Sequence, residues 1–152
     1  MLLRHAAAPL RDLDIVARWA IANACIGNDD AHAKNLSILY TDGGIQIAPA
    51  YDVVCTAVYP VLQQRFALSL GGAFTVEALT PSVLRKFARS LNFTPPAASL
   101  LVDEVSSRIA AATDETIDVV ARQHGRRSIL EKMRHEIARR TTAVRHGLLG
   151  GA

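Results

Sequence analysis

The sequence predicts a mainly α-helical domain that carries one small β-hairpin. Half of the 152 residues are hydrophobic but only 5% are aromatic, so Ala, Leu, Val and Ile supply most of the apolar surface. Several long segments place their apolar residues at helical spacing, whereas only one short region has the clear alternation of paired strands. The length is that of one domain, and we expect a single domain over residues 1–152.

The first helix is expected over residues 11–27. Asp12 or Asp14 can cap its start, because a short carboxylate accepts hydrogen bonds from the free backbone N–H groups of the first turn. The segment is apolar nearly all round, which indicates a buried helix with Trp19 in the core. Gly27 is expected to end it.

A β-hairpin is expected after a polar loop. Apolar residues alternate with other residues over 36–40 and again over 45–47. The four residues between them, Thr-Asp-Gly-Gly, tolerate the positive φ angles of a tight turn. Pro49 ends the second strand, and a short extended piece follows.

The remaining chain predicts helices. Thr-Pro pairs open segments 80–92 and 94–123, where Thr caps the helix and Pro fits its first turn. The second segment forms one helix or two. Gly125 interrupts the pattern, and a last helix is expected over 127–149. Residues 58–76 are expected to be irregular, with room for a short strand.

Charge is unevenly distributed along the chain. The net charge is +3, which divides into +6 from residue 121 onward and −3 over residues 1–120. A basic helical tail from about residue 121 is suited to nucleic acid or an acidic partner, and a solvated helix face explains it equally well.

The cysteines and the hydropathy indicate a cytoplasmic protein. Cys25 and Cys55 lie in apolar contexts, and we expect buried free thiols rather than a disulfide. No run of apolar residues reaches the length of a membrane span, and the N-terminal residues are too charged for a signal peptide. No membrane partner is expected.

A polar cluster lies between the first helix and the hairpin. It contains Asp29, Asp30, His32, Lys34 and Asn35. Asp52 follows the returning strand, and because a hairpin folds back, we expect Asp52 to lie near the mouth of the loop. Asp30, Asn35 and Asp52 would then share one small volume.

Two carboxylates and a carboxamide in one volume suit phosphoryl transfer. That reaction needs a carboxylate to orient a hydroxyl and accept its proton, and oxygen ligands for Mg²⁺. Asp30 would be the base, Asn35 and Asp52 the metal ligands, and Lys34 a phosphate contact. The interval from Asp30 to Asn35 equals the Asp-to-Asn interval of the protein-kinase catalytic loop.

The segments "GNDDAHAKNLSILY" and "IAPAYDVV" resemble the HipA-type serine/threonine kinases, the toxins of bacterial HipA–HipB toxin–antitoxin pairs. The C-terminal domain of that family carries a D-x-H-x-K-N-x-S loop, a hairpin and a P-x-Y-D segment. The later segment "ALSLGGAFTVEALT" is also similar to that domain. The resemblance covers roughly residues 13–91 and implies a protein-kinase-like C-terminal lobe of the α+β type.

The resemblance also implies roles for individual residues. It makes Asp30 the catalytic base and Asn35 and Asp52 the Mg²⁺ ligands. His32 and Lys34 match loop positions whose roles the resemblance leaves open, and we expect them to support the phosphates or the loop. It implies ATP as the phosphoryl donor and Mg²⁺ as a cofactor. The partners that it implies are a HipB-like antitoxin and a protein substrate such as an aminoacyl-tRNA synthetase.

The N-terminal lobe that holds ATP in a kinase is not recognisable. No Gly-rich phosphate loop occurs, and no Lys precedes Lys34. We therefore expect a C-terminal lobe that is inactive without an N-lobe chain. An alternative is a non-catalytic remnant that binds a partner or, through its basic tail, DNA.

A competing enzyme class is a two-metal phosphohydrolase. Asp29, Asp30, His32 and Asp52 would supply its ligands. It is disfavoured because the other four His are far away in sequence. In the kinase interpretation, Asp29 has no catalytic role and is expected to face solvent or to belong to a turn.

Overall fold

The computed structural model describes residues 6–150. Over this range the fold is mainly helical with one hairpin, as predicted. The helices are α2 (Pro9–Ile26), α3 (Pro81–Ser90), α4 (Pro95–His124) and α5 (Ser128–Leu149). The strands are β1 (Ile38–Thr41) and β2 (Gly44–Ile47), and short 3₁₀ helices cover Ala33–Asn35, Thr56–Val58 and Val76–Ala78.

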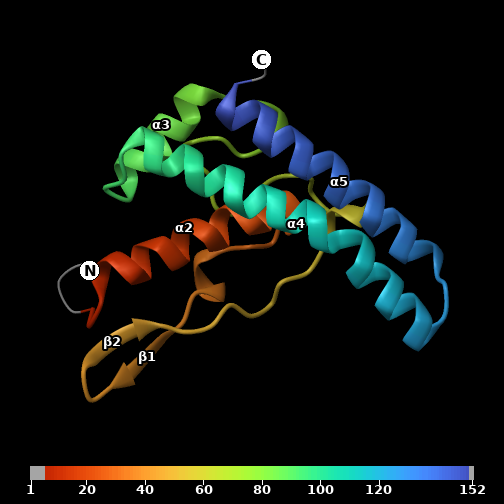
Figure 1. Ribbon diagram of the computed structural model, residues 1–152, viewed down its shortest axis with the longest axis horizontal. Helices are drawn as coiled ribbons and strands as arrows, with labels where there is room; N and C mark the ends of the chain where they lie inside the picture. The colour runs from red at the N-terminus through yellow and green to blue at the C-terminus, as the bar shows by residue number, and fades with distance from the viewer. Residues whose placement is uncertain (1–5, 151–152) are drawn as a thin grey trace.

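The helices form one packed group, and the hairpin lies at its edge. Helices α4 and α5 run antiparallel as a long pair, and α2 crosses beneath them and contacts both (Figure 1). Helix α3 packs against α4 and α5 at the end of the pair that lies opposite the turn between them (Figure 1). The hairpin projects beside the N-terminal end of α2 (Figure 1).

The core lies where α2, α3, α4 and α5 meet. Its most buried side chains are small or aliphatic, which agrees with the low aromatic content of the sequence. Ala17 and Ile21 of α2, Val102 of α4 and Val144 of α5 belong to this core, and none of the four exposes measurable surface. Burial of such apolar surface is the main force that holds the helices together.

Helix α2 begins earlier than the predicted capping residues. It starts at Pro9, and its N-cap, Ala8, makes no side-chain cap. Asp12 is buried instead and accepts a hydrogen bond from the backbone N–H of Ile47 (3.2 Å), which ties α2 to the hairpin. Because this partner lies on a distant strand, the local capping pattern gives no sign of it. Gly27 ends the helix in the left-handed conformation, as predicted.

The hairpin is antiparallel and pairs Ile38 with Ile47 at its open end. Thr41 pairs with Gly44, so Asp42 and Gly43 form a two-residue loop. The predicted turn is therefore confirmed. The hairpin matters for the site because its second strand returns the chain to the loop that follows α2.

The later helices also follow the sequence pattern. The hydroxyls of Thr80 and Thr94 accept hydrogen bonds from backbone N–H groups of the first turns of α3 and α4. Segment 94–123 belongs to one helix, not two. The short strand considered within residues 58–76 is absent from the described structure, where Leu70 and Ala73 form only an isolated bridge.

The two cysteines are free and buried, as expected. Among the helices of residues 6–150, none combines the length and the apolar character that crossing a bilayer requires.

Candidate active site

The loop after α2 is held at its start by the segment that follows the hairpin. The carbonyl of Gly27 accepts hydrogen bonds from the backbone N–H of Ala57 (2.9 Å) and the hydroxyl of Thr56 (3.2 Å). The same Thr56 oxygen accepts a hydrogen bond from the backbone N–H of Asp29 (2.8 Å). Two segments that are distant in sequence are thereby fixed side by side.

Asn28 makes a second link between these segments. Its side-chain amide donates to the side-chain oxygen of Asn23 (2.9 Å) and to the backbone carbonyl of Asp52 (3.0 Å). Asn23 in turn donates to the carbonyl of Trp19 (2.8 Å). Sequence reasoning assigned no role to Asn28, although a polar residue between a buried helix and a strand is a signal for a structural hydrogen bond.

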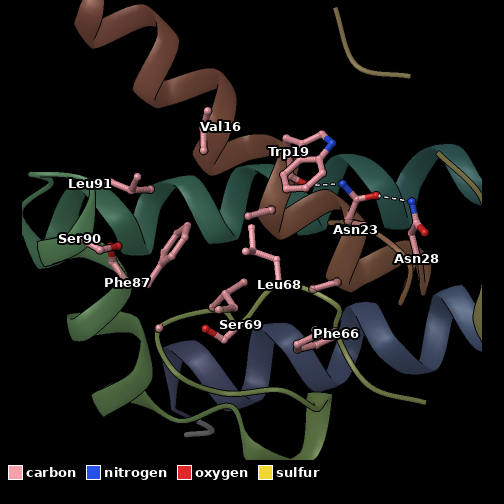
Figure 2. Close-up of a pocket in the computed structure, with 15 residues that line it drawn as sticks. Val16, Trp19, Asn23, Asn28, Phe66, Leu68, Ser69, Phe87, Ser90 and Leu91 are labelled. Atoms are coloured by element: carbon pink, nitrogen blue, oxygen red, sulfur yellow. Dashed lines mark hydrogen bonds between the residues drawn. The ribbon is translucent and has the colours of Figure 1, made fainter. Parts of the chain in front are cut away.

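Asn23 and Asn28 lie at one end of a largely apolar cavity (Figure 2), and the volume of this cavity is about 210 Å³. Phe66 and Phe87 line other parts of it. The two amides bond to each other and to backbone oxygens, so they hold the loop in place.

Asn35 and Asp52 are in direct contact. Asn35 ends the 3₁₀ helix Ala33–Asn35, and its side-chain N–H donates to a carboxylate oxygen of Asp52 at 2.6 Å. The two residues are 17 positions apart, and the hairpin between them accounts for their meeting. Asp52 is exposed and has a φ of 55°, a left-handed conformation that is uncommon for a residue other than glycine. Backbone strain of this kind gathers at functional sites.

The pair fits a magnesium ion in its donor chemistry. Asn35 is only 4% exposed, and its side-chain oxygen is buried without a hydrogen-bond partner in the described structure. An unpaired buried amide oxygen is costly, and a cation offers it a partner. Mg²⁺ prefers oxygen donors, keeps several waters and takes one or two protein carboxylates. Asn35 and Asp52 supply such a donor set.

The other predicted site residues are not bound to this pair. Asp30 is exposed and makes no hydrogen bond or ion pair within residues 6–150. It lines a cavity of about 490 Å³ together with Thr56 and Arg65. The structure therefore places Asp30 on the same loop as Asn35 and does not join their side chains.

His32 and Lys34 lie between Asp30 and Asn35. Lys34 is exposed, and its backbone carbonyl accepts a hydrogen bond from the Tyr51 hydroxyl (2.8 Å). His32 is half-buried, and its Nδ1 has no partner in the described part of the chain. The Tyr51 contact is a further bridge between the loop and the segment after the hairpin, next to Asp52.

The expectation that Asp29 faces solvent is wrong, whereas the alternative expectation, that it belongs to a turn, is confirmed. Its carboxylate is buried and forms a bidentate ion pair with Arg140 of α5, with N–O distances of 2.8 and 2.7 Å. The partner is 111 residues away, so no local pattern could have revealed it. With both oxygens engaged by Arg140, Asp29 is not available as a ligand of the two-metal alternative.

Arg140 also contacts Glu136 on its own helix. Burial would lower the pKa of the Arg140 guanidinium, but hydrogen bonds with Asp29 and Glu136 outweigh this effect and raise its pKa above the ordinary value. Burial would likewise raise the pKa of Glu136, whereas hydrogen bonds from Arg139 and Arg140 lower it overall. These charges therefore stabilise one another in the folded state.

Among residues 6–150, no group of three or more His, Cys, Asp or Glu side chains is placed to hold a metal ion. This finding concerns a different donor set from that of Asn35 and Asp52, which combines an amide oxygen with one carboxylate.

Comparison with known proteins extends this description. The family model of the HipA-like C-terminal domain matches residues 1–113. The putative kinase Y4mE of Sinorhizobium fredii is 33% identical over 123 residues, which cover 78% of this chain and 29% of that protein. The serine/threonine-protein kinase toxin HipA of Shewanella oneidensis is 29% identical over 100 residues, which cover 66% of this chain and 23% of that protein.

A solved structure has a similar fold. It contains Shewanella oneidensis HipA and HipB with their operator DNA, and it matches with a TM-score of 0.71 at 23% identity, covering 89% of this chain and 30% of that chain. At this identity the match shows the kinase-like fold of HipA and no more.

The chain spans less than a third of the length of these curated relatives. The family match covers most of the chain, including the whole loop, the hairpin and Asp52. The chain belongs to the HipA-like C-terminal domain family.

Proposed function

We propose that the chain is the C-terminal catalytic lobe of a HipA-like serine/threonine protein kinase, which transfers a phosphoryl group from ATP to a protein hydroxyl with Mg²⁺. The observation that carries the proposal is the 2.6 Å contact between Asn35 and Asp52. Through this contact the side-chain N–H of Asn35 bonds to the carboxylate of Asp52. The oxygen of the same Asn35 amide is buried and has no partner in the described structure. Family membership supplies the reaction class.

Asp30 acts as the catalytic base in this proposal. A base must come within hydrogen-bond reach of the hydroxyl whose proton it accepts. Asp30 suits this role because its carboxylate is exposed, is not engaged by another residue of the described chain and borders a cavity. It would orient the serine or threonine hydroxyl of the acceptor and take its proton as the phosphoryl group is transferred.

Asn35 and Asp52 would hold Mg²⁺ through oxygen atoms. Their contribution would be to place a positive charge that offsets the negative charge of the ATP phosphates. The Asn28 contact with the Asp52 carbonyl and the Tyr51 contact with the Lys34 carbonyl keep the two ligands on adjoining segments.

Lys34 and His32 support the phosphates or the loop. The exposed ammonium of Lys34 provides a cation one residue before Asn35, where it can approach phosphate. His32 is half-buried, and its unpaired Nδ1 in the described chain is a candidate contact that orders the loop.

ATP also needs an N-terminal lobe, which we propose is supplied outside the 152 residues, by another chain or by another part of a longer polypeptide. The curated relatives are more than three times as long as the matched segment, which leaves ample room for such a lobe in them. The chain alone is then inactive, because half of the ATP site is missing.

The relatives suggest partners. By analogy with the HipA–HipB–operator DNA complex, we propose a HipB-like antitoxin and DNA as partners of the assembled kinase. An aminoacyl-tRNA synthetase is the proposed type of protein substrate, and the cytoplasm is the proposed location.

The test is phosphoryl transfer from labelled ATP in an assembly of the chain with its ATP-binding lobe. Asp30→Asn should abolish transfer without unfolding the chain, because it removes the base and preserves the side-chain shape. Asp42→Asn is the matched control, since it removes a carboxylate from the hairpin turn, where asparagine is equally favoured. Retained transfer in Asp30→Asn would contradict the proposal.

A second candidate function, a non-catalytic module that binds DNA, is favoured by the turn between α4 and α5. Four cations near this turn, Arg122, Arg126, Arg127 and Lys132, make no ion pair within residues 6–150. Neutralising Arg126 and Arg127 should weaken DNA binding and reduce its dependence on salt. Affinity that is independent of salt would dismiss this candidate.

A further inference from the structure

We propose that Arg140 is a positioning residue for the catalytic loop. The proposal rests on the proposed function, in which Asp30 is the base. Arg140 does not touch the reacting groups and acts through Asp29, the neighbour of Asp30.

Asp29 is held at every polar group by a different part of the fold. Its carboxylate is fixed by both terminal nitrogens of Arg140, and its backbone N–H by the hydroxyl of Thr56. Its carbonyl accepts a hydrogen bond from the backbone N–H of Ala67 (2.9 Å). This carbonyl belongs to the peptide that joins Asp29 to Asp30, so the contacts fix the peptide plane from which the Asp30 side chain departs.

The guanidinium also contacts the segment that borders the cavity beside Asp30. One terminal nitrogen of Arg140 donates to the side chain of Gln64 (3.2 Å), and the neighbours of Gln64, Gln63 and Arg65, line the cavity. Arg140 thus links the loop that carries the base to the segment that faces it.

The path of Arg140 to the loop depends on a glycine. A Cβ at Gly27 would lie 3.2 Å from the Cδ of Arg140 and 2.8 Å from the Cβ of Ala57. The absent side chain therefore leaves room for the arginine stem. Arg140 itself lies outside residues 1–113, the part that the family model matches. The catalytic loop of the matched domain is held by a residue of the helical tail.

A buried ion pair is also compatible with a purely structural role. The two roles differ in their consequences, because a structural role changes stability alone, whereas a positioning role changes turnover in a protein that stays folded. The neighbouring Arg139 offers a matched control. It bonds to the same Glu136, makes no hydrogen bond or ion pair with Asp29 in the described structure, and is 44% exposed.

The main variant is Arg140→Lys. It keeps the positive charge but removes the planar guanidinium group that bonds to both carboxylate oxygens of Asp29. In the assembled kinase we expect kcat to fall at least tenfold and the KM for ATP to stay within twofold. Arg139→Gln should leave both parameters within twofold. A folded Arg140→Lys with wild-type kcat would overturn the proposal.

The double variant Asp29→Asn/Arg140→Gln guards against a folding failure. It replaces the buried ion pair with two neutral amides that can still bond to each other, so no isolated charge stays buried. The same fall in kcat is expected, because the double variant also lacks the guanidinium group of Arg140. Wild-type kcat in the folded double variant overturns the proposal as well.

Amide hydrogen exchange in the full 152-residue chain separates this inference from the proposed function. In Arg140→Lys, the Asp29 and Ala67 amides should exchange at least tenfold faster, while the Ala48 amide, which donates to Ser37 beside the hairpin, is unchanged. Unchanged protection of Asp29 and Ala67 overturns the positioning role. Absence of phosphoryl transfer in the assembled wild type overturns the proposed function instead, and the exchange data then decide the positioning role alone.

Discussion

Replacing Arg140 with methionine should destabilise the fold strongly. The two side chains of its ion pair with Asp29 are 2% and 4% exposed, so the substitution leaves a carboxylate buried without its counter-charge. Removing one partner of a buried ion pair costs about 3–5 kcal/mol. Methionine preserves most of the volume of the arginine stem, and the loss is therefore chiefly electrostatic.

The magnitude follows from the contacts. Arg140 makes two hydrogen bonds to Asp29, one to Glu136 and one to Gln64. The partners Glu136 and Gln64 lie nearer the surface and recover some hydration, whereas Asp29 does not. We therefore expect a loss of about 4 kcal/mol, within the range for a broken buried pair. For a chain of this size, that corresponds to a fall in Tm of about 8–16 °C.

The assay is urea unfolding followed by circular dichroism, applied as a double-mutant cycle with Asp29→Asn. The loss in the free energy of unfolding should be smaller in the double variant than the sum of the losses in the two single variants. The double variant has no buried charge that lacks its counter-charge, whereas Arg140→Met alone does. Arg139→Met is the control. Because the Arg139 side chain is 44% exposed and Glu136 keeps its hydrogen bond to Arg140, this substitution should cost less than about 1 kcal/mol. A loss below about 1 kcal/mol in Arg140→Met, or strict additivity in the cycle, would refute the reasoning.

Three further predictions concern the same fold. Gly27→Ala should cost about 2–4 kcal/mol, since alanine at a φ of 76° is strained and its Cβ would meet Ala57 at 2.8 Å; an unchanged urea midpoint would argue against the close packing. Because the pKa of Glu136 is lowered in the fold, its contribution to stability is present above its unfolded pKa and is lost as pH falls through the lower folded value. The fall in the urea midpoint between neutral and acidic pH should be smaller in Glu136→Gln, and an identical profile would contradict this. Burial raises the pKa of the Cys25 thiol to about 12 and also raises that of Cys55, so neither should react with Ellman's reagent until the chain is unfolded, and rapid labelling of the native chain would count against their burial.

The secondary structure was largely predictable because its signals are local. Thr-Pro pairs, Gly27 and the turn around Asp42 act within a few residues of their own positions. The start of α2 was not predictable in this way, since Asp12 bonds to a strand instead of capping the helix. Tertiary contacts of this kind override local preference.

The candidate site was predictable where the hairpin determines the geometry. A two-residue turn returns the chain beside the loop that ends in Asn35, which led us to expect Asp52 nearby, and the Asn35–Asp52 hydrogen bond confirms this position. The buried role of Asp29 could not be predicted, because its partner Arg140 lies on another helix, 111 residues away. The role of Asp30 stays a prediction, since no side-chain contact in residues 6–150 joins it to the Asn35–Asp52 pair.

The most direct test of the proposed magnesium site follows the side-chain amide signals of Asn35 by ¹⁵N NMR during a titration of the 152-residue chain with Mg²⁺. Three proteins are compared: the wild type, Asp52→Ala and the control Asp42→Asn. Our account predicts a saturable shift of the Asn35 amide signals in the wild type and in Asp42→Asn, and its loss in Asp52→Ala. An Asn35 signal that does not move with Mg²⁺, or that moves equally in Asp52→Ala, would contradict the account.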